Sequence, residues 1–94
     1  MNYLPTVFLK QAADDHRLLP THLSLVMAVF YFSNDSAPRE AIKVSRSRLM
    51  QFSRIKSIAT YHKCLKELVD FGYISYQPSY HPINASSIWL LNEN

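Results

Sequence analysis

A single glycine, Gly72, in 94 residues is the feature that most restricts what this chain can fold into. Average usage would give about six or seven glycines in a chain of this length. Glycine-rich phosphate loops, dinucleotide-binding fingerprints and most folds built from many tight β-turns need glycine at fixed positions. These three classes are therefore excluded together.

Length and composition indicate one soluble globular domain spanning residues 1–94. A hydrophobic content of 48% with 18% charged residues excludes a wholly disordered chain. The longest apolar run, Leu25–Phe32, is much shorter than the roughly 20 residues that cross a bilayer. The start of the chain shows no secretory signal, and the one cysteine, Cys64, cannot form an internal disulfide. We therefore expect a cytoplasmic protein without a membrane partner.

The charge is distributed unevenly along the chain. Residues 39–66 carry eight cations against one carboxylate, a net charge of +7, whereas the remainder carries −4. The cations are Arg39, Lys43, Arg46, Arg48, Arg54, Lys56, Lys63 and Lys66. Such a positive field suits binding to a polyanion, although a solvent-exposed surface without a charged partner is equally consistent with this composition. The position of these residues in the fold has to distinguish a binding surface from a merely solvated one.

Two helices are predicted in the first third of the chain. Residues 5–15 are predicted as a short helix with Pro5 in its first turn, where a missing N–H costs nothing, although residues 6–9 are equally compatible with an extended chain. The inner face of this helix is expected to hold Val7, Phe8 and Ala12. Residues 21–33 form a second, largely buried helix. Its inner face is expected at positions i, i+3, i+4 and i+7, which are Leu23, Val26, Met27 and Phe30.

The second part of the chain reads as strand, helix, turn and helix. Residues 41–44 alternate as a short strand, and Ser45 caps a helix over residues 46–52. The inward residues of that helix are predicted to be Leu49, Met50 and Phe52. After a turn at residues 53–56, Ser57 caps a longer helix that ends near Phe71. Its buried face is expected to hold Tyr61, Cys64, Leu65 and Leu68.

The end of the chain is predicted to return as two strands. Gly72 stands where a left-handed residue ends a helix. Residues 73–77 and 86–91 have strand character, with a proline-rich loop between them.

This order of elements is that of a winged helix-turn-helix. The fold class expected is α+β and mainly helical: a three-helix core, an extra N-terminal helix and a small antiparallel sheet with a wing. The helix-turn-helix spans about residues 45–71 and the wing hairpin about 73–92. Because the +7 segment lies on the helix-turn-helix, double-stranded DNA is the expected partner, with the helix Ser57–Phe71 in the major groove.

The block Leu49–Tyr80, LMQFSRIKSIATYHKCLKELVDFGYISYQPSY, resembles a family of small winged-helix proteins of bacterial mobile genetic elements. The segment Arg17–Phe30, RLLPTHLSLVMAVF, is similar to the opening helix of that family. The sequence pattern over residues 53–65 is specific to that family, whereas the pattern over residues 68–74 is generic and similar to that of many bacterial winged helices. Members are mostly regarded as transcriptional regulators, so the resemblance implies this fold and DNA binding without a target sequence.

The wing departs from that family. The resemblance leads us to expect a glycine and basic residues at its tip, but residues 78–91 hold no glycine, Lys or Arg. Any grip on phosphate there would rest on neutral donors such as Ser79, Tyr80, Asn84 and His81.

The candidate DNA-binding residues fall into three groups. Lys63 and Lys66 on the exposed side of the longer helix, and Arg46 and Arg48 at the start of the shorter one, are expected to contact phosphates. Arg54 and Lys56 lie beside the N-terminus of the longer helix, which itself favours anions. Ser57 and Thr60 can act there too, although Ser57 is as readily explained as a helix cap. Base edges are expected to meet Thr60, His62 and Lys63.

Other functions are less well supported by the residues. Nothing places a nucleophile beside a base, and the four histidines and Cys64 have no metal-ligand spacing, so we expect neither an enzyme nor a cofactor. Two alternatives to a transcriptional regulator stay open: an accessory factor for excision or replication of a mobile element, and a winged helix that binds a protein. A homodimer is expected, with residues 5–15 as the available extra element.

Overall fold

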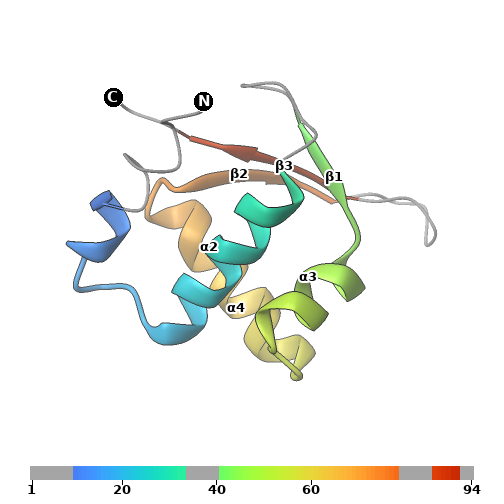
Figure 1. Cartoon of the computed structure of the whole chain (residues 1–94), viewed down its shortest axis with the longest axis horizontal. Helices are drawn as coiled ribbons and strands as arrows, with labels where there is room; N and C mark the ends of the chain where they lie inside the picture. Colours follow the sequence, from blue (N-terminus) through green and yellow to red (C-terminus); the bar gives the residue numbers. More distant parts are fainter. Residues whose placement is uncertain (1–9, 34–40, 79–85, 92–94) are drawn as a thin grey trace.

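The computed structural model describes residues 10–33, 41–78 and 86–91 (Figure 1). They form a compact α+β domain that is mainly helical, with four helices and a small three-stranded antiparallel sheet. After a helical turn at residues 10–13, the elements follow in the order α2 (Pro20–Phe32), β1 (Ile42–Val44), α3 (Arg46–Ser53), α4 (Ile58–Asp70), β2 (Ile74–Gln77) and β3 (Ser86–Leu90).

The sheet joins the middle of the chain to its end. Its strand order is β1-β3-β2, so β3 pairs antiparallel with both neighbours. Ile88 lies opposite Ile42 on one side and Tyr76 on the other, and its side chain is fully buried. Because alternate residues of a strand face opposite sides, this row packs toward the helices. Figure 1 shows the sheet along one side of the domain and the helices along the other.

The helix ends follow the predicted capping residues. The Ser45 hydroxyl accepts a hydrogen bond from the Arg48 backbone N–H at 3.2 Å, and the Ser57 hydroxyl accepts one from Thr60 N–H at 3.2 Å. Gly72 has a φ of 87°, the left-handed conformation that glycine adopts without strain. These three predictions are confirmed.

The turn between α3 and α4 starts at a non-glycine residue in a left-handed conformation. Arg54 has a φ of 66°, and its backbone N–H bonds the Met50 carbonyl. This conformation costs a residue with a Cβ about 1 kcal/mol. The chain changes direction within residues 54–57, and α4 begins directly afterwards.

The buried face of α4 is the predicted one. Tyr61, Cys64, Leu65 and Leu68 are all buried in the core. They belong to one buried cluster with residues of α2, α3 and the sheet. The rest of the core is built by Leu25, Val26, Ala28, Val29, Leu49, Ile42, Ile74 and Ile88, among others.

The predicted inner face of α2 is partly wrong. Val26 and Phe30 are buried, but Leu23 is 39% exposed and Met27 48% exposed. In a helix that is apolar on nearly every side, several stripes have helical spacing, so periodicity cannot select one. The prediction that Phe52 of α3 points inward is also wrong, since this ring is exposed and stacks on Tyr31 at a centroid distance of 4.8 Å.

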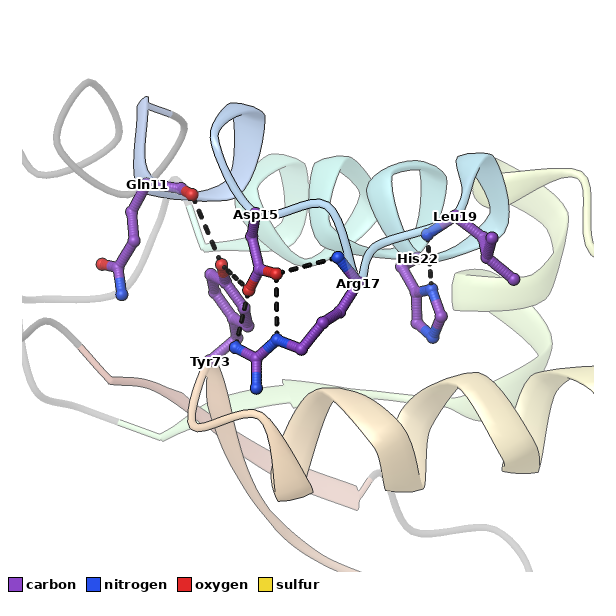
Figure 2. A network of polar contacts seen from close by, with 6 residues as sticks. All are labelled: Gln11, Asp15, Arg17, Leu19, His22 and Tyr73. Carbon is purple, nitrogen blue, oxygen red and sulfur yellow. Dashed lines mark hydrogen bonds and ion pairs between the residues drawn. The ribbon is translucent and has the colours of Figure 1, made fainter.

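A polar network fixes the segment before α2 to the turn that precedes β2 (Figure 2). The Tyr73 hydroxyl donates a 2.7 Å hydrogen bond to Asp15, whose two carboxylate oxygens also accept bonds from the Arg17 guanidinium at 2.9 and 2.7 Å. Arg17 in turn lies over the Phe71 ring, 4.4 Å from its centroid. This network connects the segment before α2 to the turn between α4 and β2.

His22 forms a second polar connection, inside the domain. Its Nδ1 accepts a 2.8 Å hydrogen bond from the Leu19 backbone N–H, so Nε2 carries the proton that it donates to the Glu67 carboxylate at 2.8 Å. The imidazole is almost fully buried. Glu67 thereby holds the C-terminal half of α4 against the N-terminus of α2.

The N-terminal helix expected over residues 5–15 is described only from residue 10. Residues 10–13 are helical, and the chain turns at residue 14. Ala12 is buried as predicted, whereas residues 5–9 lie outside the described part. Within the described ranges, no helix has the length and apolar character needed to cross a membrane.

Candidate nucleic-acid interface

Seven cations of the basic segment lie in described residues, and all seven are exposed. They are Lys43, Arg46, Arg48, Arg54, Lys56, Lys63 and Lys66. Residues 41–66 contain no Asp or Glu. Within the described part of the chain, Lys66 alone among the seven forms an ion pair, at 3.4 Å from Asp70. Since both partners of that pair are well exposed, it contributes little and leaves the ammonium accessible.

The outer face of α4 is centred on two lysines. At about 100° per residue, Ala59, Lys63 and Lys66 share the side opposite the buried stripe. The small side chain of Ala59 leaves the helix backbone accessible on this face near the N-terminus of α4. A polyanion can therefore approach the backbone of α4 closely there.

The predicted base-reading residues lie on opposite flanks of that face. Thr60 and His62 are about 160° apart around the helix axis. Thr60 is half-buried on the side of the α3–α4 turn, whereas His62 is exposed on the side of β2. Lys63 lies between them, so among the three predicted base-reading residues only Lys63 occupies the centre of the exposed face.

A groove at the α3–α4 turn brings together four predicted residues. Arg54, Lys56, Ser57 and Thr60 line a cavity of about 390 Å³ together with the first turn of α2. The open backbone N–H groups of α4 begin here, adding partial positive charge to two cations. The chemistry of the groove favours a phosphate oxygen.

The first turn of α2 contributes a residue that the sequence analysis did not select. Thr21 lines the same groove, beside Ser24, whose hydroxyl donates a 2.6 Å hydrogen bond to the Ser53 carbonyl. That bond ties α2 to the end of α3 and fixes the groove's width. The sequence does not indicate that Thr21 lies in this groove, because Thr21 is far along the chain from the basic segment and a hydroxyl residue is common at the start of a helix.

His62 and Lys66 line a second groove, between α4 and β2. This cavity of about 380 Å³ is otherwise walled by Leu65, Val69 and Tyr76. It is separate from the groove at the turn, so the structure does not bring all predicted residues to one place.

The two arginines of α3 diverge. Arg48 lies 5.8 Å from the centroid of the Phe32 ring and, with Arg54, lines a third groove of about 350 Å³ beside Tyr31 and Phe52. Arg46, the first residue of α3, lies on the other side, within electrostatic range of Tyr61. Burial raises the pKa of the Tyr61 hydroxyl well above its ordinary value, more than the charge of Arg46 lowers it. Tyr61 is a neutral core residue.

Two predicted contacts cannot be placed. Tyr80 and Asn84, the neutral residues expected to grip phosphate from the wing, lie outside the described residues. In the part of the chain that is described, no three His, Cys, Asp or Glu side chains are grouped so that they can hold a metal ion.

Comparisons of the chain with protein-family models, with curated proteins and with solved structures found no match.

Proposed function

We propose that this protein is a winged helix-turn-helix that binds double-stranded DNA and regulates transcription. In this proposal α3 and α4 are the helix-turn-helix, α4 enters the major groove, and β2 and β3 form the stem of the wing. The observation that carries the proposal is the exposure of seven cations over residues 41–66 with no carboxylate among them.

The dimensions of α4 support insertion into DNA. Its 13 residues make a rod about 20 Å long and roughly 10–12 Å across. The major groove of B-DNA is about 12 Å wide. With α4 in the groove, Lys63 faces the floor, and Thr60 and His62 face its two walls.

The groove at the α3–α4 turn supports a phosphate anchor. Arg54 and Lys56 flank the N-terminus of α4, and Ser57 and Thr60 supply hydroxyls beside it. A phosphate held there would set how far α4 enters the major groove, because contacts to the backbone fix register and orientation. Base readout would then depend on few side chains, and DNA shape would contribute to specificity.

The first test is fluorescence anisotropy with two labelled duplexes, one from upstream of the protein's own gene and one scrambled. If four to seven cations contact phosphates, the logarithm of the association constant falls against that of the salt concentration with a slope of about −4 to −6. Preference for the native duplex supports a regulator. Equal, salt-sensitive binding to both supports an accessory factor instead, and no binding at low salt contradicts the DNA proposal.

Variants separate reading from anchoring. Replacing Thr60 and His62 together by alanine is expected to reduce the preference for the native duplex, because both flanks of α4 lose their polar groups. The Arg54→Ala and Lys56→Ala variants are expected to weaken binding to both duplexes alike. An equal loss on both duplexes for the Thr60/His62 variant would contradict a reading role.

A further inference from the structure

An apolar stripe runs along the exposed side of α2. Leu23, Met27 and Tyr31 follow one another at intervals of four residues, so they share one ridge of the helix, and Leu19, the N-cap residue, precedes Leu23 by the same interval. Phe52 of α3 extends the ridge by stacking on Tyr31. We define these five residues as the α2 stripe; their exposed fractions range from 39% to 56%.

We propose that the α2 stripe is the interface of a homodimer, in which the α2 helices of two copies cross antiparallel. The contact lies outside the basic surface of α4 and does not require DNA. It also differs from the dimer contact through residues 5–15 that the sequence analysis expects.

The size of the stripe is sufficient for a reversible dimer. A large apolar side chain has a surface of about 200 Å², so five half-exposed ones present roughly 500 Å². That is near the upper end of the apolar patches that monomers expose, about 300–600 Å². Two such faces bury about 1,000 Å², the lower bound of a specific interface, so the dimer is expected to be weak and reversible.

The chemistry of the stripe favours a second copy over a charged partner. Residues 20–32 contain no Asp, Glu, Lys or Arg. Two copies can therefore bring these faces together without burying an unpaired charge. A ridge of residues spaced by four is also the one that packs into the matching groove of an identical helix, at a crossing angle of about −50°.

The cations beside the Tyr31 end of the stripe favour the antiparallel arrangement. In a two-fold pair, Leu19 of one copy faces Tyr31 of the other, and Leu23 faces Met27. The Tyr31 end adjoins the groove lined by Arg48 and Arg54, which carry +2. A parallel pair would bring these cations of the two copies together, whereas an antiparallel pair keeps them apart.

Sedimentation velocity without DNA tests the interface, over protein concentrations of about 10 to 500 µM, because association depends on protomer concentration. The wild type is expected to form dimers in this range. Met27→Glu is expected to weaken association at least tenfold, since it places two unpaired carboxylates in an apolar contact. Val69→Glu is the matched control, because Val69 is similarly exposed on α4; this variant is expected to dimerise like the wild type.

A further variant keeps the result interpretable. If Met27→Glu fails to fold, Leu19→Glu tests the same stripe at a position before α2 begins. Because these measurements contain no DNA, a negative result for the dimer leaves the DNA proposal intact. A duplex long enough for only one copy is expected to bind the Met27→Glu variant with the same affinity as the wild type.

Three results would overturn the proposal. A wild type that stays monomeric throughout the range has no such interface. A dimer that survives both Met27→Glu and Leu19→Glu associates elsewhere. A monomeric wild type whose melting temperature falls strongly on Met27→Glu, but not on Val69→Glu, indicates that the chain's own residues cover the stripe.

Discussion

The two longest helices of the described chain, α2 and α4, are the same length and face the same core, yet they present opposite outer surfaces. Each has 13 residues. The outer face of α4 carries Lys63 and Lys66, whereas that of α2 carries Leu23, Met27 and Tyr31. The outer face of a helix therefore indicates its partner: cations favour a polyanion, and uncharged apolar groups favour another apolar surface.

The largest expected effect tests which side of α2 faces the core. Leu25→Ala is expected to lower the free energy of unfolding by about 3 kcal/mol, because Leu25 is fully buried and its loss leaves a cavity. Leu23→Ala, two residues earlier, is expected to cost less than about 1 kcal/mol, because Leu23 is exposed. Urea unfolding at low micromolar concentration measures both. Equal losses would contradict the assignment of the α2 faces.

The contrast between α2 and α4 also explains how far the sequence alone could lead. In α4, polar residues mark the outside, so the buried positions Tyr61, Cys64, Leu65 and Leu68 were predicted correctly. The caps Ser45 and Ser57 and the left-handed Gly72 were predicted because each depends on local chemistry.

The errors arise where the information is not local. Nothing within α2 distinguishes Leu23 from Leu25, since only the packing of α3, α4 and the sheet decides which is covered. The same holds for the candidate site. The clustering of basic residues is visible in the sequence, but the contribution of Thr21 to the groove depends on the contact between α2 and α3.

The next effect concerns the bond that joins the two helices. Glu67→Ala is expected to lower the free energy of unfolding by about 1–2 kcal/mol, because it leaves the buried Nε2–H of His22 without its acceptor. Asp70→Ala is the matched control. It removes a carboxylate three residues further along α4 that forms only an exposed ion pair, and is expected to cost less than about 0.5 kcal/mol. Thermal unfolding compares the melting temperatures of the two variants. A similar shift in both would assign the effect to the loss of a negative charge rather than to the hydrogen bond with His22.

A smaller effect is expected on the outer face of α4. Lys63→Ala is expected to weaken duplex binding about fivefold near 0.1 M salt, equivalent to about 1 kcal/mol. It should also reduce the preference for the native duplex, because in the proposed arrangement Lys63 faces the groove floor, where base edges lie. Lys10→Ala removes the same charge from the helical turn before α2 and is expected to leave binding unchanged. If both variants bind alike, net charge rather than the face of α4 governs affinity.

The smallest effect is a change in pH dependence at the network around Asp15. Hydrogen bonds from the Arg17 guanidinium and the Tyr73 hydroxyl hold the pKa of Asp15 well below its ordinary value. A lowered folded-state pKa gives stability that is complete above about pH 4 and is lost as the pH falls toward the folded-state pKa. Burial, followed by the bond to Asp15, raises the pKa of Tyr73 to about 12. That contribution is complete below about pH 10 and is lost as the pH rises toward 12.

Asp15→Asn separates the acid limb from the alkaline limb. Without a titrating carboxylate, the acid decline in melting temperature should flatten, while the alkaline decline should largely persist because burial is the main cause of the Tyr73 shift. Asp14→Asn makes the same charge change at the exposed neighbouring residue and should retain the acid decline. Melting curves from about pH 2 to 12 measure both limbs. If Asp14→Asn and Asp15→Asn flatten the acid limb equally, the loss of stability in acid reflects the overall charge and not the bonds from Arg17 and Tyr73.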